Sequence, residues 1–436
     1  MQGVDRLTHF LRGRGLRSGR EIQAGLGISQ PMLSRLIQEA GPRISRFGRS
    51  VATRYALARE IPGVGPRSPV YRVDEAGSVS EHGVMHWLAD NGCWLERSAG
   101  DSQFYGGLPP FAADISPQGF IGRHFPTTYP DLDLPARVHF WDNDDRIIAL
   151  AHRGEDCVGN LIIGDVSLDR FLEQDRGSRD RSDYPSLVAD VLNGQAGSSA
   201  GGEQPKFATY SGGRHLLVKF MSGDGSAADR WRDLLVAERL ALEVLRAAGF
   251  ATPRADWFDL DGCRYLEVER FDRVGPKGRR GVVSLQAVVC EFLGEDPRRW
   301  SSAVPRIAEH PSLTLSRGDA DRIVWLDLFG ELIGNVDRHS GNLRFFAEDA
   351  WEMHLSLAPV YDMLPMIFAP AGSILVNRRF APSPPTPQNH DVWFEAASRA
   401  REYWEILHDE EGLTADFRRL VGECRRTLIH LIHQSS

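Results

Sequence analysis

The six residues from Asp337 to Asn342 most constrain what this chain can fold into. They run Asp337-Arg338-His339-Ser340-Gly341-Asn342, and a second isolated acid follows at Asp362 in Pro359-Val360-Tyr361-Asp362. An acid that orients a hydroxyl, an amide a few residues later and a further acid beyond it are the side chains that a phosphoryl-transfer site requires. The spacing predicts an ATP-dependent kinase.

The chemistry explains why these residue types are needed. Phosphoryl transfer requires cations held against the phosphates and an acceptor oxygen aimed in line. Magnesium prefers oxygen ligands, which Asp362 and Asn342 offer, so that Asp337 is left to accept the proton of the acceptor hydroxyl. The alternative is an ordinary polar turn. The catalytic interpretation is favoured because an apolar, helical stretch over 323–333 precedes the loop and an expected strand over 343–346 follows it.

A predicted hairpin supplies the lysine that such a site needs. Two apolar, strand-like runs over 206–210 and 215–220 flank Ser211-Gly212-Gly213, which is typical of a tight turn. The hairpin would hold Lys219 on a rigid strand. Just upstream of this turn, the Gly- and Ser-rich stretch 197–206 would let backbone N–H groups approach phosphate oxygens, although such a stretch is also typical of a linker.

Four motifs in this order resemble the HipA family of bacterial serine/threonine kinases, the toxins of persistence-type toxin–antitoxin systems. The motifs lie at 199–206, at 268–273 (Val-Glu-Arg-Phe-Asp-Arg), at 337–342 and at 361–362. The resemblance implies a two-lobed kinase with ATP and Mg²⁺ as cofactors, Asp337 as the catalytic acid, and Asn342 and Asp362 on the metal. The ATP-binding residues that it implies are Gly201, Gly202, Glu203, Gln204, Pro205, Lys206, Lys219, Glu269, Phe271, His339, Asn342 and Asp362.

The same resemblance implies a means of self-inhibition. Ser199 matches the serine that such kinases phosphorylate in themselves, which expels the phosphate loop, and the neighbouring Ser198 leaves that assignment open by one residue. Glu238, on an expected helix over 229–248, could pair with Lys219 as the structural glutamate of kinase helices, or could instead lie on a solvated helix face.

The N-terminal residues have a different character. Residues 1–60 hold eleven Arg and four acids, a formal charge of +7, whereas the remainder carries −15. This reversal is typical of a nucleic-acid-binding module fused to another function. A short helix over 18–25, a turn and a second helix with Ser29 as N-cap predict a helix-turn-helix, and 43–55 predicts a two-stranded wing. The candidate DNA contacts are Gln30, Ser34 and Arg35 for bases, and Arg46, Arg49 and Arg54 for phosphates or a minor groove. The alternative is a small helical module for protein contacts.

The expected fold class is α+β. A winged helix-turn-helix over 1–60 would precede a small α/β subdomain over 61–180, similar to the N-terminal subdomain of HipA, and the kinase domain would occupy 181–436 with a helical C-terminal lobe. The Pro/Gly-rich stretch 63–68 predicts a linker. His82 and His86 would share one helix face, without a further metal ligand. The fused head resembles the YjjJ-like branch of the HipA family.

The cysteine content and the hydropathy of the chain indicate its cellular compartment. Five scattered Cys without a Cys-x-x-Cys pair, no signal peptide and no run of membrane-spanning length predict a cytoplasmic protein with no membrane partner. The expected partners are a protein substrate, which by the family resemblance could be an aminoacyl-tRNA synthetase, DNA, and a possible antitoxin. Two rival functions remain: a DNA-binding regulator that uses the kinase-like fold as a nucleotide sensor, and a small-molecule kinase.

Overall fold

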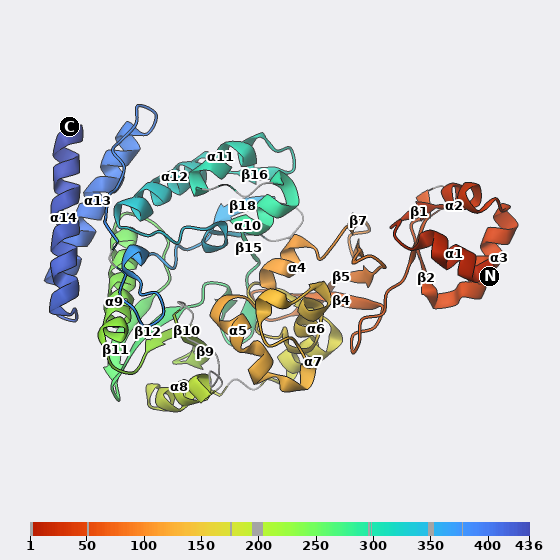
Figure 1. Ribbon diagram of the computed structural model, residues 1–436, viewed down its shortest axis with the longest axis horizontal. Coiled ribbons are helices and arrows are strands. Elements are labelled where there is room, and N and C mark those ends of the chain that lie inside the picture. Colours follow the sequence, from red (N-terminus) through yellow and green to blue (C-terminus); the bar gives the residue numbers. More distant parts are fainter. Residues whose placement is uncertain are drawn as a thin grey trace. The chain divides into compact units, whose positions relative to one another are not determined.

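The chain forms two compact units, and Figure 1 labels their helices and strands. The computed structural model describes residues 3–49, 52–174, 177–193, 204–294, 297, 299–347, 353–376 and 378–436. The first unit comprises Met1–Val73, Ser78–Pro117 and Pro130–Gln174, and the second comprises Asp74–Gly77, Gln118–Tyr129 and Asp175–Ser436. The basic head and most of the middle segment therefore belong to one compact unit.

The head of the first unit contains three helices, α1 (Gly3–Leu11), α2 (Gly19–Leu26) and α3 (Gln30–Ala40). Ser18 and Glu21 form a reciprocal capping box that starts α2, and Gly27 ends it in the left-handed conformation (φ 64°). Ser29 is the N-cap of α3, as predicted, although its side chain makes no capping hydrogen bond. The apolar faces of the three helices pack together, so the two predicted helices and their turn are confirmed.

A small antiparallel sheet follows the helices. Its strands β1 (Arg17–Ser18), β3 (Arg54–Leu57) and β2 (Ile44–Phe47) lie in that order, and a 3-10 turn, η1 (Gly41–Arg43), leads from α3 into β2. The β2–β3 hairpin occupies the position predicted for the wing.

The segment after this hairpin is not the linker that its Pro and Gly content predicts. Ile61 is fully buried and forms a turn closed by hydrogen bonds with Gly65. The ring of Phe47 stacks on Trp94 at 4.9 Å between centroids, and the N–H of Ala89 donates to the carbonyl of Leu57 at 2.8 Å. The prediction of a linker was wrong because buried apolar contacts and backbone hydrogen bonds fix the head to the sheet that follows it.

That sheet is the framework of the middle segment. Its five antiparallel strands run in the order β7 (Ser102–Tyr105), β6 (Cys93–Arg97), β5 (Val79–Trp87), β4 (Arg67–Val73) and β8 (Leu161–Ile163). Its helices are α4 (Pro110–Ile115), α6 (Asn143–Arg153) and α7 (Asp165–Glu173), with short 3-10 turns η3 (Pro130–Leu132) and η4 (Val138–Phe140). His82 and His86 lie on strand β5, so the helical face predicted for them was wrong.

The second unit begins with a four-stranded antiparallel sheet, in the order β11 (Ala255–Leu260), β12 (Cys263–Glu269), β10 (Arg214–Met221) and β9 (Lys206–Ser211). The long helix α9 (Ser226–Ala247) packs against this sheet (Figure 1). The other elements of this region are η5 (Arg181–Asp183), α8 (Tyr184–Asn193), the short pair β13 (Arg273–Val274) and β14 (Gly278–Arg279), and α5 (Gly119–Thr128), whose residues cluster with this unit.

The rest of the second unit is mainly helical. Its helices are α10 (Leu285–Val288), which continues into the π-turn η6 (Val289–Leu293), α11 (Trp300–Glu309), α12 (Arg317–Leu332), α13 (His390–Asp409) and α14 (Ala415–Ser435). A second sheet has the order β15 (Val282–Ser284), β17 (Arg344–Phe346), β18 (Met353–Leu357) and β16 (Leu313–Leu315), and short 3-10 turns are η7 (Ser340–Asn342) and η8 (Met366–Phe368). One large apolar core joins α9 to α12, α13 and α14. Strand β10 of the predicted lysine hairpin contacts α9, so the hairpin and the predicted catalytic loop belong to one compact unit.

Candidate active site

The predicted lysine lies at the centre of a buried ionic cluster. Strands β9 and β10 form the expected hairpin, with Gly212 and Gly213 in the left-handed region at its turn. The Nζ of Lys219 lies 2.7 and 2.6 Å from the two carboxylate oxygens of Glu238 and 2.6 Å from Oδ1 of Asp362. The pairing of Lys219 with Glu238 is confirmed, and β10, α9 and the segment after β18 each contribute one charge to the cluster.

The charges of this cluster depend on one another. Burial opposes the charge of Lys219, but the nearby carboxylates of Asp362 and Glu238 outweigh it and raise the pKa of Lys219. Burial also opposes ionisation of Asp362, yet Lys219 and Lys206 bring the pKa of Asp362 down to about 2. Burial raises the pKa of Glu238, and Lys219 offsets this only in part. The cluster thus keeps Asp362 ionised at neutral pH, in the form that binds a cation.

Asn335 connects the two candidate acids. It is buried to 1% exposure just after α12 ends. Its Oδ1 accepts the backbone N–H of Asp337 at 3.0 Å, and its Nδ2 donates to the backbone carbonyl of Asp362 at 3.4 Å. The loops that carry Asp337 and Asp362 are therefore held by one side chain, while Asp337 itself is exposed to solvent.

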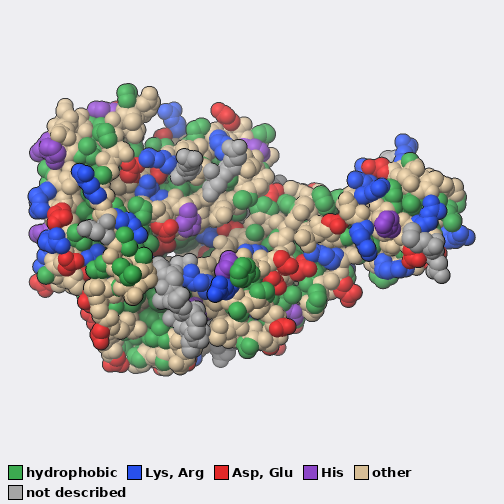
Figure 2. Space-filling view, in the orientation of Figure 1, with side chains coloured by type: hydrophobic (Ala, Val, Ile, Leu, Met, Phe, Trp, Pro, Cys, Tyr) green, Lys and Arg blue, Asp and Glu red, His purple; other side chains and the backbone are tan. Residues whose placement is uncertain are grey.

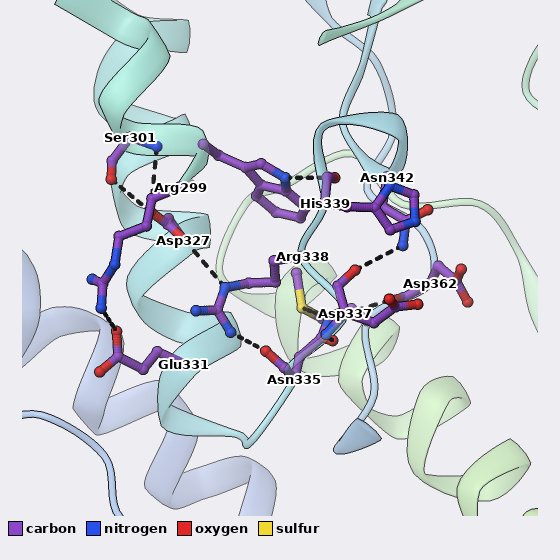
Figure 3. A network of polar contacts seen from close by, with 12 residues as sticks. Arg299, Ser301, Asp327, Glu331, Asn335, Asp337, Arg338, His339, Asn342 and Asp362 are labelled. Atoms are coloured by element: carbon purple, nitrogen blue, oxygen red, sulfur yellow. Dashed lines mark hydrogen bonds and ion pairs between the residues drawn. The ribbon is translucent and has the colours of Figure 1, made fainter. Parts of the chain in front are cut away.

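The remaining residues of the predicted loop are fixed by hydrogen bonds within the loop and by one from Trp300 (Figure 3). The Nδ2 of Asn342 donates to the backbone carbonyl of Asp337 at 2.9 Å, so its amide oxygen stays available to a ligand. The side chain of His339 caps η7 by accepting the N–H of Gly341 at 3.1 Å, and the Nε1 of Trp300 donates to the carbonyl of His339 at 3.0 Å. The structure brings Asp337, His339, Asn342 and Asp362 into one region (Figure 3).

Arg338 points away from Asp337 and Asp362 and anchors the loop on α12 (Figure 3). Its Nε lies 3.1 Å from Oδ1 of Asp327, which is 3% exposed, and its NH1 donates to the carbonyl of Asn335. The other carboxylate oxygen of Asp327 accepts the hydroxyl of Ser301 at 2.5 Å. A Cβ at Gly330 would lie 2.5 Å from Cδ of Arg338, so this packing requires glycine there.

Asn335 and Asp327 were not predicted from the sequence. An acid inside the apolar run 323–333 was the one signal for Asp327, since a buried carboxylate needs donors. Nothing local marks Asn335, whose role depends on a loop that lies 27 residues later.

The motif 268–273 lies where β12 ends. The N–H of Glu269 donates to the carbonyl of Arg254 at 2.9 Å, and Phe271 is half-buried, with its ring 5.7 Å from that of Tyr361. Asp272 is buried between the guanidinium groups of Arg270 and Arg273, at 3.0 and 2.6 Å. This ion cluster fixes the chain after the sheet, and adenine recognition by Glu269 and Phe271 stays a prediction.

The predicted phosphate loop lies partly outside the described residues, which exclude Ser198, Ser199, Gly201, Gly202 and Glu203. The Nε2 of Gln204 donates to the carbonyl of Phe220 at 2.5 Å, and the N–H of Phe220 donates to the carbonyl of Pro205 at 3.0 Å. Lys206 then faces Lys219 across the β9–β10 pair. The end of the predicted loop therefore enters the sheet beside the buried cluster.

The candidate DNA contacts lie on the surface of the head. Gln30, Ser34 and Arg35 on α3 are all exposed. Arg46 and Arg49 are exposed at the hairpin, whereas Arg54 is half-buried and donates to the carbonyl of Thr53 at 3.2 Å. Figure 2 shows basic side chains over the visible face of the head. Their role in DNA binding stays a prediction.

Comparison with known proteins identifies the family. The profile of the YjjJ-like toxin middle domain matches residues 64–172, and that of the HipA-like C-terminal domain matches residues 198–430. Toxin YjjJ of Escherichia coli (strain K12) is 34% identical in an alignment 435 positions long that covers 96% of this chain and 96% of that protein. The chain belongs to the HipA-like toxins, in their YjjJ-like branch.

A solved HipA structure shows the fold. HipA of Shewanella oneidensis MR-1, determined with HipB and operator DNA, matches with a TM-score of 0.54 at 14% identity, over 84% of this chain and 97% of that chain. The predicted fold class is confirmed: the YjjJ-like chain is mixed α+β and contains the two-lobed, kinase-like arrangement of HipA. The β9–β12 sheet with α9 forms one lobe, and the helical region with Asp337 and Asp362 forms the other.

No helix among the described residues is both long and apolar enough to cross a membrane.

Proposed function

We propose that this chain is an ATP-dependent serine/threonine protein kinase of the HipA type that requires Mg²⁺. The observation that supports it most is the convergence of a buried Lys219–Glu238 pair with Asp362, next to a loop whose Asp337 is exposed and whose Asn342 keeps a free amide oxygen. This set can hold phosphates, a cation and an acceptor hydroxyl together.

The donor set suits magnesium. Mg²⁺ is usually held in such sites by one or two carboxylates or amide oxygens, with substrate phosphates and water completing its shell. Asp362 and Asn342 would be those ligands. Such a site needs no dense cluster of side chains, and within the described ranges there is no group of three or more His, Cys, Asp or Glu that could hold a metal. When bound, the cation would neutralise charge that develops on the transferred phosphoryl group.

The remaining residues act on the two reactants. Lys219 would contact the phosphates of ATP together with Lys206 and the loop of Gly201, Gly202 and Glu203, with His339 beside the nucleotide and Glu269 and Phe271 at the adenine. Asp337 would accept the proton of the acceptor hydroxyl while the bond from that oxygen to the γ-phosphorus forms and the bond to the leaving ADP breaks. The fixed position of Asp337 relative to Asp362, through Asn335, supports this division of roles.

The direct test is transfer from γ-labelled ATP. The wild-type chain should label a protein in a cell lysate, and Asp337→Asn should bind ATP but lose labelling, because its side chain no longer accepts the proton. Labelling at an undiminished rate in Asp337→Asn would refute the assignment of the base. Labelled small molecules alone would favour a small-molecule kinase, and Mg²⁺-dependent ATP binding without any transfer would favour a nucleotide sensor.

We also propose self-regulation at Ser199, or at its neighbour Ser198. A phosphate in a loop that is meant to hold the triphosphate adds a charge of about −2, and repulsion would favour an expelled, nucleotide-free loop. Phosphopeptide mapping after incubation with ATP should find one of these serines modified. An active enzyme without phosphate on either would contradict this form of regulation.

The head would bind DNA in the same chain. The HipA of Shewanella oneidensis was determined with HipB and operator DNA; here the exposed residues of α3 and the β2–β3 hairpin are proposed as the DNA contacts. This would let the chain reach an operator without a separate DNA-binding antitoxin. Its protein substrate, for which an aminoacyl-tRNA synthetase is the first candidate to test, should emerge from comparing phosphopeptides of lysates treated with wild type and Asp337→Asn.

A further inference from the structure

A cavity in the kinase unit is built from residues that the proposed phosphoryl transfer does not use. It measures about 540 Å³, a size that suits a small ligand. One wall is the segment between Asp362 and α13, and the other is α14. The lining residues are Phe368, Arg378, Arg379, Phe380, Leu420, Glu423, Cys424, Arg426 and Thr427.

The cavity combines an apolar floor with a basic rim. Phe368, Phe380 and Cys424 belong to the buried core and provide the floor. Arg378, Arg379 and Arg426 are exposed at the rim. We call this cavity the arginine pocket. An aromatic or aliphatic group would be dehydrated against the floor while an anionic group met the guanidinium groups.

One arginine of the rim is held in position before any ligand binds. The NH1 of Arg378 donates to the carbonyls of Ile367 and Ala369, at 3.1 and 3.0 Å. Because these bonds fix the guanidinium group, less conformational freedom would be lost when it contacts an anion. These carbonyl partners are neutral, so the guanidinium group of Arg378 keeps its positive charge.

The charge of the rim is not balanced locally. Glu423 is the one acid among the lining residues, and its Oε1 lies 3.0 Å from NH1 of Arg419, which offsets its charge. Within the part of the chain that the structure describes, no carboxylate lies within ion-pair distance of Arg379 or Arg426. Three guanidinium groups beside one compensated acid favour an anion.

We propose that the arginine pocket binds a phosphate-bearing group whose carrier has an apolar or aromatic part. Phosphate is favoured over a single carboxylate because several arginine forks can each contact a different oxygen of a dianion. The phosphate could belong to a free metabolite or to a phosphorylated side chain of a protein, and both offer the same chemistry to the rim.

The pocket is also connected to the loop that carries Asp337. The N–H of Ile367 donates to the carbonyl of Gly334 at 3.0 Å, and a Cβ on Gly334 would lie 2.9 Å from Ile367 and 3.5 Å from Phe380. The wall of the pocket therefore packs on the residue that precedes Asn335. A ligand on Phe368 and Phe380 would stabilise this wall, so its binding should be measurable as a shift in thermal unfolding.

Titration calorimetry on the full chain, at fixed ionic strength, tests the proposal by measuring the affinity for each probe. The probes are phenyl phosphate, phenol, inorganic phosphate and a short peptide with phosphoserine beside phenylalanine. The nucleotide site is filled with a non-hydrolysable ATP analogue and Mg²⁺, or left empty if the chain does not bind ATP. Phenyl phosphate or the peptide should bind at least tenfold more tightly than inorganic phosphate, and phenol should not bind. The probe that binds better distinguishes a metabolite from a phosphorylated protein segment.

Three variants locate the binding. The double variant Arg379→Gln/Arg426→Gln changes exposed side chains only and should lower the affinity for the tighter-binding probe at least tenfold. Glu423→Gln should raise this affinity several-fold, because it removes a negative charge from the rim. A purely structural role of these residues would not produce such a gain. Arg401→Gln on α13, outside the pocket, is the matched control and should bind as wild type does. The proposal is overturned if no phosphate probe binds, or if the double variant binds as tightly as Arg401→Gln does.

Discussion

Glu238→Gln is the sharpest test of the buried cluster. The substitution keeps the size of the side chain and its ability to accept one hydrogen bond, but it removes a negative charge that is 1% exposed. In the native chain both carboxylate oxygens of Glu238 contact Nζ of Lys219, at 2.7 and 2.6 Å. After the change, Asp362 at 2.6 Å is the remaining carboxylate partner of Lys219 in the cluster.

The structure sets the size of the expected loss. Removing one partner of a buried ion pair costs about 3–5 kcal/mol when the other charge is left unpaired. Here Lys219 keeps Asp362, whose side chain is 29% exposed and therefore still partly solvated, so we expect about 2 kcal/mol. For the second unit, which is larger than 250 residues, that corresponds to a fall in Tm of roughly 3–4 °C.

The same change should alter the magnesium dependence of phosphate transfer. In the native cluster Lys219 is shared between two carboxylates. Without Glu238, Lys219 is drawn more strongly to Asp362, and a cation that binds Asp362 must compete with that contact. We expect the Mg²⁺ concentration for half-maximal transfer to rise about tenfold, which is about 1.4 kcal/mol of added competition.

Differential scanning calorimetry and transfer of labelled phosphate across a magnesium titration measure the two effects. Glu243→Gln is the matched control, because Glu243 is on the same helix and pairs with Arg239 at 2.7 Å, but its side chain is 43% exposed. The control should change stability by less than about 0.5 kcal/mol and leave the magnesium titration unchanged. Equal Tm values and equal magnesium curves for Glu238→Gln and Glu243→Gln would refute the role given to the cluster.

Three further predictions follow from the site and the head. Asp362→Asn should lose about 2 kcal/mol of stability at pH 6 in urea unfolding, and its difference from wild type should shrink by pH 3. The pKa of Asp362 in the folded chain is about 2, below its unfolded value, so its contribution to stability is present above about pH 4 and is lost as the pH falls toward 2. A difference that grows on acidification contradicts this. Asp327→Asn should lower kcat far more than it raises the KM for ATP, because Arg338 loses the anchor that holds the loop of Asp337. Glu331→Gln, which breaks the partly exposed contact with Arg299, should leave both kinetic constants near wild type. Replacing Arg46, Arg49 and Arg54 by Ala should weaken binding to every duplex, and the slope of log affinity against log salt concentration should fall by about 0.9 for each phosphate that is no longer neutralised. Gln30→Ala should instead change the sequence preference. Fluorescence anisotropy on random and genomic duplexes at several salt concentrations separates these outcomes.

The sequence was sufficient where local chemistry decides the structure. Glycines at 212 and 213 allow the left-handed turn that places Lys219 on a strand, and the capping box of Ser18 with Glu21 begins the first helix of the predicted helix-turn-helix. Both features depend on residues within a few positions of one another. Apolar spacing also placed α9. An apolar run placed α12, in which residues 325–330 are all buried.

It was insufficient where tertiary contacts override local preference. The Pro/Gly content of 63–68 predicted a linker, yet this stretch contains the start of β4, since the sheet of the middle segment supplies its hydrogen-bond partners. His82 and His86 have a spacing that fits a helix face, but both lie on β5, whose pairing with β4 shifts register at His82. The spacing alone could not discriminate a helix from such a strand.

Asn335 shows why a list of motif residues is not yet an active site. Asp337 and Asp362 were recognised by their separation in the sequence, which says nothing about their separation in space. A single buried amide sets that geometry, because it accepts from the backbone of one acid and donates to the backbone of the other. A substitution of Asn335 would change none of the predicted residues Asp337, Asn342 and Asp362. The relative position of the acceptor hydroxyl and the cation would nevertheless no longer be fixed. Transfer requires the attacking oxygen and the phosphoryl group to be aligned. We therefore expect Asn335 to affect the rate of transfer although its side chain contacts the two loops and neither reactant.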